Sequence, residues 1–573
     1  MKIELAEHSG FCMGVRNAIL RIVNEINTSD EEIYVYGPLI HNPQTLDVLG
    51  NRGVRTIYSL EGIEGRQIAI RTHGIPVEEY RQIKERSSRV INLTCPRVAR
   101  VQSIIKRYSE QGYFTIITGD RDHAEVAGLK SYASSGVHVV TEIKDLETLP
   151  HAEKYVLVSQ TTFDRRLFRE FVSELTGKIS EIEVIDTICD STRDRQGSVM
   201  KGIGNRIDTL VVAGGKNSAN TNRLAQIGRD SGIKTFHIER EDELLDSDFS
   251  DSSNVLVTAG ASTPGWIINN VLERLYRIKY RKMNFFINAV KIFLEFVVRT
   301  NLLSAVTASF ITLLAGKFMG AGADTAAALI SFLYIFSMYS VNNYFDREFL
   351  RESNSYKYAI YNRFGVPLMA VSILFMGLCM WLSLRYTGLT QLMLFLSFLF
   401  GFSYLSGPVK KLVKSMGSPF IRRAYNSKVI TSFGWLIVTV ALPAMNSSPG
   451  PVGLAGVTVM VFSLIFLRHV LIDIIMLQGD LIMGRESLPI LIGNSRIYTL
   501  SYVTGTVSAL VFAAAAVMTG QWPFLLLVLP LAYYMGLAAW IKKLKYLVSL
   551  KYEILTDLNL CLVIAIYCVL VSM

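Results

Sequence analysis

Apolar and polar positions follow two different patterns along this chain, and the change falls near residue 280. Before it, short runs of β-branched and aromatic residues alternate with longer segments whose apolar residues recur at helical spacing. Most of the short runs are apolar at every position, as expected for parallel strands covered on both faces. We predict strands at 33–36, 67–70, 114–118, 137–140, 155–159, 209–213, 234–237 and 254–258, and helices that include 15–25, 98–111, 165–175 and 221–231. The first half is therefore predicted to be α/β, built from repeated βαβ units with right-handed crossovers.

From about residue 292 onward, apolar stretches recur that are each close to the ~20 residues a helix needs to cross a bilayer. The predicted spans are 296–316, 322–341, 366–384, 389–406, 429–445, 452–470, 497–518, 522–541 and 554–572. This half is predicted to be an all-α membrane bundle of about nine transmembrane helices. We accordingly divide the chain into a domain at 1–280, a basic linker at 281–291 and a membrane domain at 292–573.

The formal net charge of +10 would suggest a nucleic-acid partner in a soluble protein. The basic residues instead gather after the even-numbered predicted spans, as at Arg347 and Lys542, whereas the opposite connections hold little beyond Lys317 and Arg385. The positive-inside rule then places the N-terminal domain in the cytoplasm and the chain in the cell (inner) membrane as a multi-pass protein, in contact with lipid. No nucleic-acid partner is expected. No signal peptide is predicted either, because residues 2–5 already look like a strand.

The run at 274–282 is basic and free of acidic residues, and it directly precedes the first predicted span. One interpretation is a solvated helix end. The other is contact with anionic lipid headgroups, which attract such segments.

Three cysteines of the first half each stand where an apolar run gives way to small, polar or proline residues. Cys12, Cys95 and Cys189 are therefore expected at strand ends, where they can converge on one site. They lack the paired Cys-x-x-Cys units that are usual in structural zinc sites. Three thiolates that hold a cubane iron–sulfur cluster would leave one iron open to a substrate. The alternative is three ordinary buried thiols.

Other polar side chains gather after strand-like segments, where ligands collect in parallel sheets. They are His41, His73, His123, Ser218, Asn220 and Ser262. Imidazole, hydroxyl and amide donors suit a diphosphate, and the glycine-rich loop 214–218 before a helix offers backbone N–H groups to an anion. The alternatives are structural histidines and an ordinary glycine turn with a helix N-cap.

A series of short motifs connects these residues. The motifs are GFCMGV at Cys12, GPLIHN at His41, RTHG at His73, TCP at Cys95, DHAEVAG at His123 and Glu125, SQTT at Thr161, DTICDSTRDRQ at Cys189, GGKNSANTNRL at Ser218 and Asn220, and TAGAST at Ser262. With all of them in this order, residues 1–280 resemble the LytB (IspH) family of 4-hydroxy-3-methylbut-2-enyl diphosphate reductases. Ala219 departs from the family, which often has a second serine there.

The resemblance implies a [4Fe-4S] cluster on the three cysteines, at the centre of the α/β domain, and a diphosphate held by the six polar side chains named above. It implies Glu125 as the proton donor and Thr161 as its assistant. A solvated surface carboxylate is the alternative for Glu125. The implied reaction uses two electrons and two protons to convert (E)-4-hydroxy-3-methylbut-2-enyl diphosphate to isopentenyl and dimethylallyl diphosphates. The implied electron donor is a ferredoxin or flavodoxin.

Two predicted cytoplasmic connections carry acids beside apolar helix ends. Asp346 lies in NNYFDRE at 342–348, and Asp473 and Asp480 lie in DIIMLQGD at 473–480, which GRESLP follows. Acids at membrane helix ends are often interfacial anchors. Carboxylates on one side of a bundle can alternatively hold Mg²⁺ that bridges to a diphosphate.

The spans and both loops make residues 292–573 similar to the UbiA superfamily of intramembrane prenyltransferases. The resemblance implies a Mg²⁺ site at Asp346, Asp473 and Asp480 and the transfer of a prenyl group to an acceptor. Other positions depart from it, because Asn343, Leu350 and Met476 stand where that family has acids.

Two functions therefore compete for the whole chain. In one, a cytoplasmic reductase is joined to an active membrane prenyltransferase. In the other, the reductase is the only enzyme and the membrane half is an anchor or a lipid-binding module. A third interpretation, a diphosphate-binding module without redox chemistry, is disfavoured because all three cysteines are present.

Overall fold

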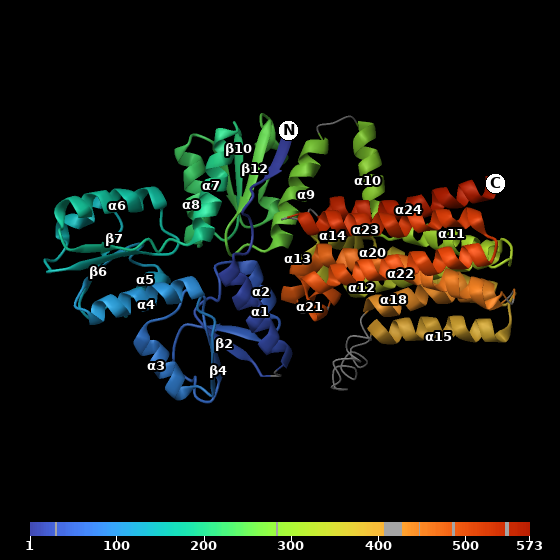
Figure 1. Ribbon diagram of the computed structural model, residues 1–573, viewed down its shortest axis with the longest axis horizontal. Helices are drawn as coiled ribbons and strands as arrows, with labels where there is room; N and C mark the ends of the chain where they lie inside the picture. The colour runs from blue at the N-terminus through green and yellow to red at the C-terminus, as the bar shows by residue number, and fades with distance from the viewer. Residues whose placement is uncertain are drawn as a thin grey trace. The chain divides into compact units, whose positions relative to one another are not determined.

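Twelve short strands form three separate four-stranded sheets in the first half of the chain (Figure 1). The computed structural model describes residues 1–573 except 29–30, 282–284, 406–426, 446, 448, 484–486, 545–548 and 573. It divides into two units, Met1–Lys279 with Ile482–Gly484, and Tyr280–Leu481 with Arg485–Met573.

The strand orders are β1-β12-β10-β11, β3-β2-β4-β5 and β7-β6-β8-β9, and every pairing is parallel. The strands are β1 (Lys2–Leu5), β2 (Ile33–Tyr36), β3 (Val54–Ile57), β4 (Gln67–Ile70), β5 (Arg89–Asn92), β6 (Phe114–Thr118), β7 (Val137–Val140), β8 (Tyr155–Ser159), β9 (Ile182–Val184), β10 (Thr209–Ala213), β11 (Lys234–Ile238) and β12 (Asn254–Ala259). Parallel strands need crossover connections, and helices supply most of them here. The predicted α/β architecture is confirmed.

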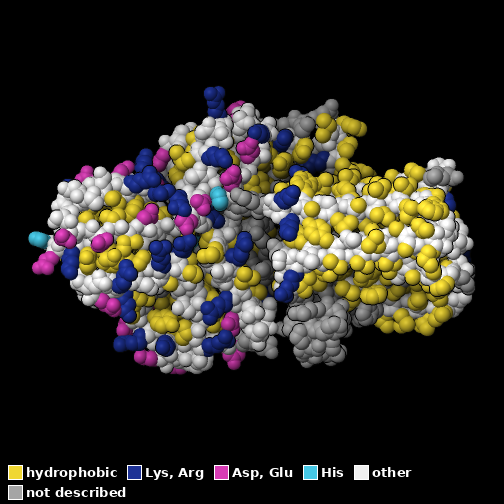
Figure 2. Space-filling model, in the orientation of Figure 1, with side chains coloured by type: hydrophobic (Ala, Val, Ile, Leu, Met, Phe, Trp, Pro, Cys, Tyr) yellow, Lys and Arg dark blue, Asp and Glu magenta, His cyan; other side chains and the backbone are white. Residues whose placement is uncertain are grey.

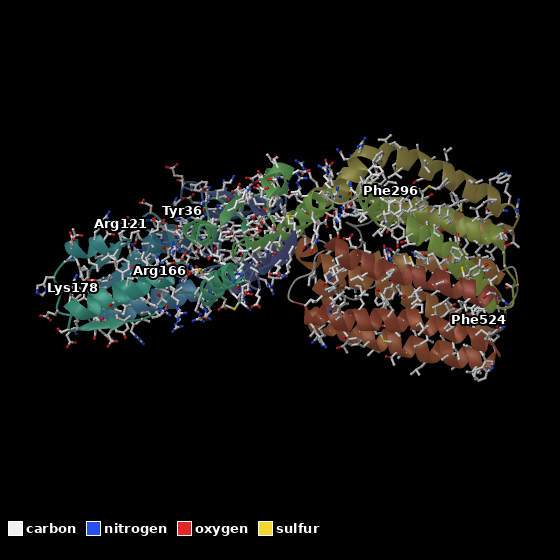
Figure 3. The ribbon with its side chains drawn as sticks, turned by 90° about the horizontal axis from the view of Figure 1, so that it is seen from above. Tyr36, Arg121, Arg166, Lys178, Phe296 and Phe524 are labelled. Carbon is white, nitrogen blue, oxygen red and sulfur yellow. The ribbon has the colours of Figure 1, made fainter. Side chains whose placement is uncertain are left out.

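The helices of this unit are α1 (Met13–Thr28), α2 (Pro43–Gly50), α3 (Val77–Arg86), α4 (Pro96–Glu110), α5 (Ala124–Lys130), α6 (Arg165–Lys178), α7 (Asp190–Gly204), α8 (Ala219–Asp230) and α9 (Gly265–Arg281). Their apolar stripes cover the sheets, as with Phe168, Phe171 and Leu175 of α6. Their charged stripes face away, and the basic side chains of Arg166 and Lys178 are exposed on the same helix (Figure 3).

All eight predicted strands are present, but three others were missed. β3, β5 and β9 each lie at a sheet edge and contain charged or amide side chains at Arg55, Arg89 or Glu183. An edge strand is paired on one side only and tolerates polar positions, so its pattern differs from that of a buried strand.

The second unit is helical throughout its described regular structure. Its helices are α10 (Phe285–Arg299), α11 (Leu302–Phe318), α12 (Thr325–Phe345), α13 (Arg347–Ser353), α14 (Ser355–Ser383), α15 (Gly388–Leu405), α18 (Ser427–Leu436), α19 (Leu442–Met445), α20 (Pro451–Met483), α21 (Leu488–Ile492), α22 (Asn494–Met518), α23 (Val528–Lys543) and α24 (Ser549–Ser572), with a π-helical turn at Ile437–Ala441 and a 3₁₀ turn at Trp522–Leu527. Hydrophobic side chains dominate its visible face in Figure 2, whereas charged ones are spread over the α/β unit. Such a surface suits a lipid surrounding.

The core of the helical unit surrounds α20. Within an apolar stretch of 18 consecutive residues in each helix, 78% of the residues are buried in α20 and 22% in α14, so α20 is central and α14 peripheral. Aromatic contacts extend the core to the bundle end, where Phe524 (labelled in Figure 3) lies edge-on to Phe318 with ring centres 5.2 Å apart.

Six described helices are long and apolar enough to cross a membrane, so about nine spans are not confirmed. A seventh is reached if the pair α10 and α11, bent by 65°, forms one span. At two other predicted spans, 389–406 and 429–445, the described apolar stretches at 388–399 and 429–445 are too short to qualify. The first predicted span, 296–316, is interrupted at Thr300 and Asn301, between the two members of the bent pair.

Candidate active site

One cavity of the α/β unit gathers every side chain predicted for the reductase site. It is lined by Cys12, Cys95, Cys189, His41, His73, His123, Glu125, Thr161, Ser218, Asn220 and Ser262. Each of these follows a strand and stands at or just before the start of a helix. The sheets therefore bring together residues up to 250 positions apart, as the rule for ligands at strand carboxyl ends predicts.

The three cysteines occupy equivalent positions, each immediately at the start of a helix. Cys95 and Cys189 are the N-cap residues of α4 and α7, and Cys12 precedes α1. The backbone N–H of Val15 donates to the Cys12 sulfur at 3.4 Å. Burial raises the pKa of the Cys95 and Cys189 thiols, against the opposing effect of nearby backbone N–H groups. Those donors and the helix N-termini favour thiolate, the form that binds metal.

Gly14 leaves room for two of the sulfurs. A methyl group on Gly14 would come within 2.5 Å of the Cys95 sulfur and 3.9 Å of the Cys12 sulfur. This position of α1 therefore admits only a hydrogen atom beside the thiols. The three sulfurs and this space fit an iron–sulfur cluster held by three cysteines.

The three histidines form a compact group on the cavity wall. The ring centres of His41 and His73 are 4.7 Å apart, and that of His123 lies 5.4 Å from His73. Burial lowers the pKa of all three imidazoles, to about 4 for His123, and Arg71 adds to the effect. They are therefore neutral at pH 7 when no anion is bound, and each ring offers one N–H donor.

Nitrogen atoms of the three rings lie within 4.8 Å of one another, so the group could also hold a metal ion. The adjoining side chains favour an anion instead. Asn220 is buried, and neither of its amide atoms has a hydrogen-bond partner among the described residues. The Nδ1 atom of His73 likewise has no such partner there. Buried polar atoms of this kind indicate a ligand with hydrogen-bonding groups.

Two serines complete this wall. Ser218 is the N-cap residue of α8, and its side chain makes no capping bond to the helix. The hydroxyl of Ser262 donates to the carbonyl oxygen of His41 at 3.0 Å and ties the loop after β12 to the loop after β2. Gly215 permits the same close approach, because a methyl group there would lie 2.5 Å from the His41 carbonyl oxygen.

Glu125 is almost completely buried, with 1% of its surface exposed, so the alternative of a solvated carboxylate is excluded. Its two carboxyl oxygens accept hydrogen bonds from Thr161, at 2.7 Å from the backbone N–H and at 2.9 Å from the hydroxyl. Burial raises the pKa of Glu125 to about 7, although both hydrogen bonds act in the opposite direction. A carboxyl group with this pKa can donate a proton near neutral pH.

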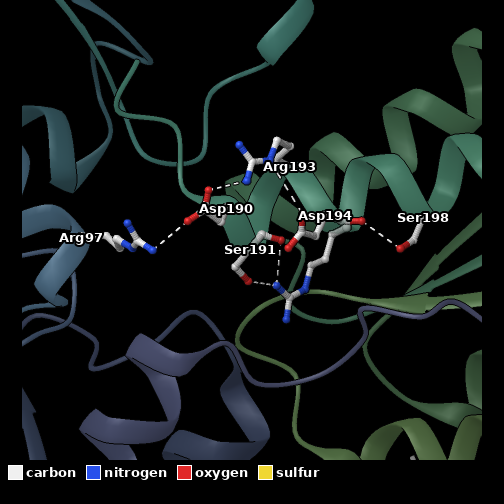
Figure 4. A network of polar contacts seen from close by, with 7 residues as sticks. Arg97, Asp190, Ser191, Arg193, Asp194 and Ser198 are labelled. Carbon is white, nitrogen blue, oxygen red and sulfur yellow. Dashed lines mark hydrogen bonds and ion pairs between the residues drawn. The ribbon is translucent and has the colours of Figure 1, made fainter. Parts of the chain in front are cut away.

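Two arginines beside the site were not singled out from the sequence. Arg97 lines the cavity and pairs with Asp190 at 2.7 Å, and Asp190 also binds Arg193 at 2.5 Å (Figure 4). Arg71 donates from Nε to the carbonyl oxygen of Gly74 at 3.3 Å, and its charge lowers the pKa of all three histidines. Arg71 stands within the motif RTHG and Arg97 directly follows TCP, but an arginine beside a histidine or a cysteine has no distinctive pattern of its own.

The predicted magnesium site of the helical unit is only partly described. Asp473 of α20 is buried, and its carboxylate accepts the backbone N–H of Leu488 at 3.4 Å. Asp346 is partly exposed between α12 and α13. The side chain of Asp480 lies outside the described residues, as does residue 486 of the GRESLP segment. Among described side chains, the three histidines are the only group of three or more that could hold a metal ion.

A polar contact joins α12, which ends beside Asp346, to α20, which contains Asp473. The hydroxyl of Tyr339 on α12 lies 2.8 Å from Nε2 of His469 on α20. Asn343 and Asp473 each follow one of these residues by four positions, which is about one helical turn. Asn343, at a position where the UbiA motif has an acid, donates instead to the hydroxyl of Tyr361 at 2.9 Å.

Fold and site together define an α/β protein in which three thiols, three histidines and a buried glutamate line one cavity. A family model described as LytB protein matches residues 3–276. The 4-hydroxy-3-methylbut-2-enyl diphosphate reductase of Geobacter sulfurreducens is 40% identical over 282 residues, which cover 49% of this chain and 99% of that protein. The enzyme of the same name from Aquifex aeolicus is 39% identical over 280 residues, 48% of this chain and 96% of that protein. The chain belongs to the LytB family of 4-hydroxy-3-methylbut-2-enyl diphosphate reductases.

Solved structures give similarities of two kinds. The structure of (E)-4-hydroxy-3-methyl-but-2-enyl diphosphate reductase, the terminal enzyme of the non-mevalonate pathway, is 36% identical, with 48% of this chain and 99% of that chain covered and a TM-score of 0.39. A UbiA homologue from Archaeoglobus fulgidus bound to GPP and Mg²⁺ is 12% identical, with 48% and 99% covered and a TM-score of 0.34. The predicted LytB resemblance is confirmed, and UbiA-type membrane proteins are among the structures to which the chain is similar.

Proposed function

We propose that the α/β unit reduces (E)-4-hydroxy-3-methylbut-2-enyl diphosphate to isopentenyl and dimethylallyl diphosphates. The observation that carries this proposal is the composition of one cavity: three thiols, a neutral histidine group and a buried acid. The identity to reductases of that name, over nearly their full lengths, supports the same substrate.

Cys12, Cys95 and Cys189 would hold a [4Fe-4S] cluster. A bound cluster supplies electrons and an iron without a protein ligand, which a substrate group can approach. The protein contributes the helix N-termini behind the sulfurs and the space at Gly14.

The polar side chains of the same cavity would bind the diphosphate. His41, His73 and His123 offer ring N–H groups, and Ser218, Asn220 and Ser262 offer hydroxyl and amide donors. An anion stabilises protonated imidazole, so a bound diphosphate raises the histidine pKa values that burial has lowered. Proton uptake therefore accompanies substrate binding near neutral pH.

Glu125 would deliver a proton to the hydroxyl group that leaves as water. Thr161 holds the carboxyl group in place through both of its oxygens. The buried setting keeps bulk water from competing for that proton.

The test is anaerobic purification of the full chain beside a Cys12→Ser variant. We expect the parent to show visible cluster absorbance and to reduce the hydroxylated diphosphate, and the variant to lose both. The proposal is contradicted if the parent purifies with all its cysteines as free thiols but without iron. It is also contradicted if the Cys12→Ser variant turns over substrate as fast as the parent. Ser9→Ala, three residues away, is the matched control.

The electron donor would be a ferredoxin or flavodoxin, whose acidic surfaces suit basic side chains near the cluster site. Arg97 on α4 and Arg193 on α7 lie in the first turns of cysteine-bearing helices. Donor binding of this kind weakens as ionic strength rises. Reduction by a small chemical reductant is expected to lack that dependence.

For the helical unit we propose a UbiA-type prenyl transfer that uses Mg²⁺. The observation in its favour is Asp473, a carboxylate that is 3% exposed inside an apolar bundle, where ionisable groups are costly and usually functional. Asp346 and Asp480 would be its partners. The unit would lie in the cell membrane with the reductase on the cytoplasmic side, as the basic connections indicate.

A transfer assay in membranes tests this second function. The probes are Mg²⁺, a labelled polyprenyl diphosphate and a lipid extract that contains acceptors, and the parent is compared with Asp473→Asn. We expect a labelled product from the parent alone. No product from a protein with active reductase, in extracts that support another prenyltransferase, favours an anchor or lipid-binding role.

A further inference from the structure

Helix α10 exposes apolar side chains around most of its circumference. The exposed ones are Phe285, Phe286, Ile287, Val290, Ile292, Phe293, Leu294 and Phe296 (Phe296 is labelled in Figure 3). Phe285 is 86% exposed and Phe293 is 64% exposed. Only Glu295, Val298 and Arg299, near the end of the helix, are buried. An exposed apolar surface of this extent needs an apolar surrounding.

The end of α10 is fixed to the bundle by charged groups. Glu295 and Arg299 form a buried ion pair at 3.2 Å, and the Arg299 guanidinium lies 5.6 Å from the ring centre of Tyr356 on α14. The chain then turns at Asn301, whose φ of 58° is left-handed. Asparagine tolerates this conformation better than most residues, and it stops the helix. The direction of α10 is therefore set by the fold of the helical unit itself.

The bend between α10 and α11 limits how far α10 extends across the bilayer. It makes an angle of 65° with α11. A helix of 15 residues is about 22 Å long, so at this angle its ends differ in height along the α11 axis by only about 9 Å. The 17 residues of α11 already cover about 26 Å, most of the ~30 Å of bilayer hydrocarbon. Hence α10 cannot serve as a span of its own.

The positive charges beside α10 indicate the kind of membrane surface that the helix contacts. The basic run at 274–282 directly precedes α10, and it contains no acidic residue. Within α10, the ammonium of Lys291 lies 4.2 Å from the ring centre of Tyr280. Cations beside an apolar helix are typical of segments that lie on anionic membrane surfaces.

We propose that α10 lies in the plane of the membrane, at the boundary between headgroups and acyl chains of an anionic lipid bilayer, as an interfacial anchor between the reductase and the first span. Lipid covers its exposed phenylalanines. The inference requires that the helical unit is in a membrane, and it is independent of whether that unit transfers prenyl groups.

Depth measurement tests this placement. The full chain is reconstituted in vesicles of phosphatidylethanolamine and phosphatidylglycerol, and Phe286→Trp, Phe293→Trp and Leu374→Trp are compared with the parent. Lipids brominated near the headgroup or near the chain end quench the added tryptophan according to its depth. We expect shallow bromine to quench both α10 variants to a similar degree. Deep bromine should quench Leu374→Trp, because Leu374 is an exposed residue of the α14 span.

Two other outcomes overturn the proposal. Clearly different depths for Phe286→Trp and Phe293→Trp mean that α10 crosses the membrane. An absence of quenching at both positions means that protein or water covers the helix. A pair of variants at the bend adds a check: Asn301→Gly, which keeps the left-handed conformation accessible, should leave the depth of Phe286→Trp unchanged, whereas Asn301→Leu should alter it.

Discussion

Glu125 combines a buried position with two hydrogen bonds from Thr161, and the two influences oppose each other. Burial favours the neutral acid, whereas both bonds stabilise the carboxylate, and the pKa of about 7 shows that burial prevails. The group is therefore protonated, and able to donate, below about pH 7. It loses its proton as the pH rises through that value.

The pH dependence of kcat/KM should accordingly fall above about pH 7 in the parent protein. Thr161→Val removes one bond that stabilises the carboxylate, so the pKa of Glu125 should rise and the fall should move to higher pH. Glu125→Gln should lower kcat by about 10²–10⁴-fold and remove this limb, with cluster absorbance intact. An unchanged limb in Glu125→Gln would assign the titration to another group.

Gly14 is constrained by the sulfur atoms beside it. Gly14→Ala would place a methyl group 2.5 Å from the Cys95 sulfur, a distance that real contacts do not allow. We expect the variant to fold but to retain little iron, measured as iron per chain after anaerobic purification. Gly197→Ala on α7 is the control, since nothing lies within 4 Å of the added methyl group and iron content should match the parent.

Helices α20 and α24 are joined by a buried ion pair. The Arg468 Nε atom donates to Asp557 at 2.8 Å, and 2% and 4% of the two side chains are exposed. Removal of one partner leaves an uncompensated charge in an apolar interior, which costs about 3–5 kcal/mol.

Arg468→Leu and Asp557→Leu should each lower the temperature midpoint of unfolding in detergent, measured from the loss of the helical circular dichroism signal. The double variant should recover much of the loss, because it buries no charge. Equal or additive losses in the double variant would show that the pair itself stabilises the bundle.

Membrane topology follows from the parity of the spans. The basic connections predict a cytoplasmic reductase. Nine predicted spans, or seven if α10 and α11 form one span, are an odd number of crossings, so a protein fused after residue 573 should lie on the opposite side of the membrane. Alkaline phosphatase fused after Met573 should be active, and a fluorescent protein fused there should be dark. The reverse result would support six crossings, the number of described helices that qualify individually.

The α/β fold was largely predictable, because the strands at sheet centres are apolar on both faces. β10, for example, is buried at every position, and its uninterrupted apolar run is typical of a central parallel strand. β5 and β9 were missed because edge strands carry polar side chains on faces that water reaches. The membrane segments were found from composition, but not their number, because hydropathy does not report the length of a helix or where it bends.

The candidate site was predicted as a set of residues, and its geometry was not. Motif order named the cysteines, the histidines and Glu125, whereas the burial of Glu125 and its bonds to Thr161 depend on how β6 and β8 pair. Arg71 and Arg97 were passed over because a basic residue beside a histidine or cysteine has no distinctive pattern.

By itself, the sequence determined which segments form the apolar centres of the sheets and which are apolar enough for a membrane, and it named the side chains predicted for redox and diphosphate chemistry, since these follow from local apolarity, residue type and motif order. Only the tertiary structure decided that the thiols and histidines share one cavity, that burial wins over hydrogen bonding at Glu125, and that the chain turns at Asn301. The shared cavity and the burial of Glu125 depend on contacts between residues far apart in sequence, and the turn depends on one backbone angle. Local composition predicts neither long-range contacts nor a single backbone angle.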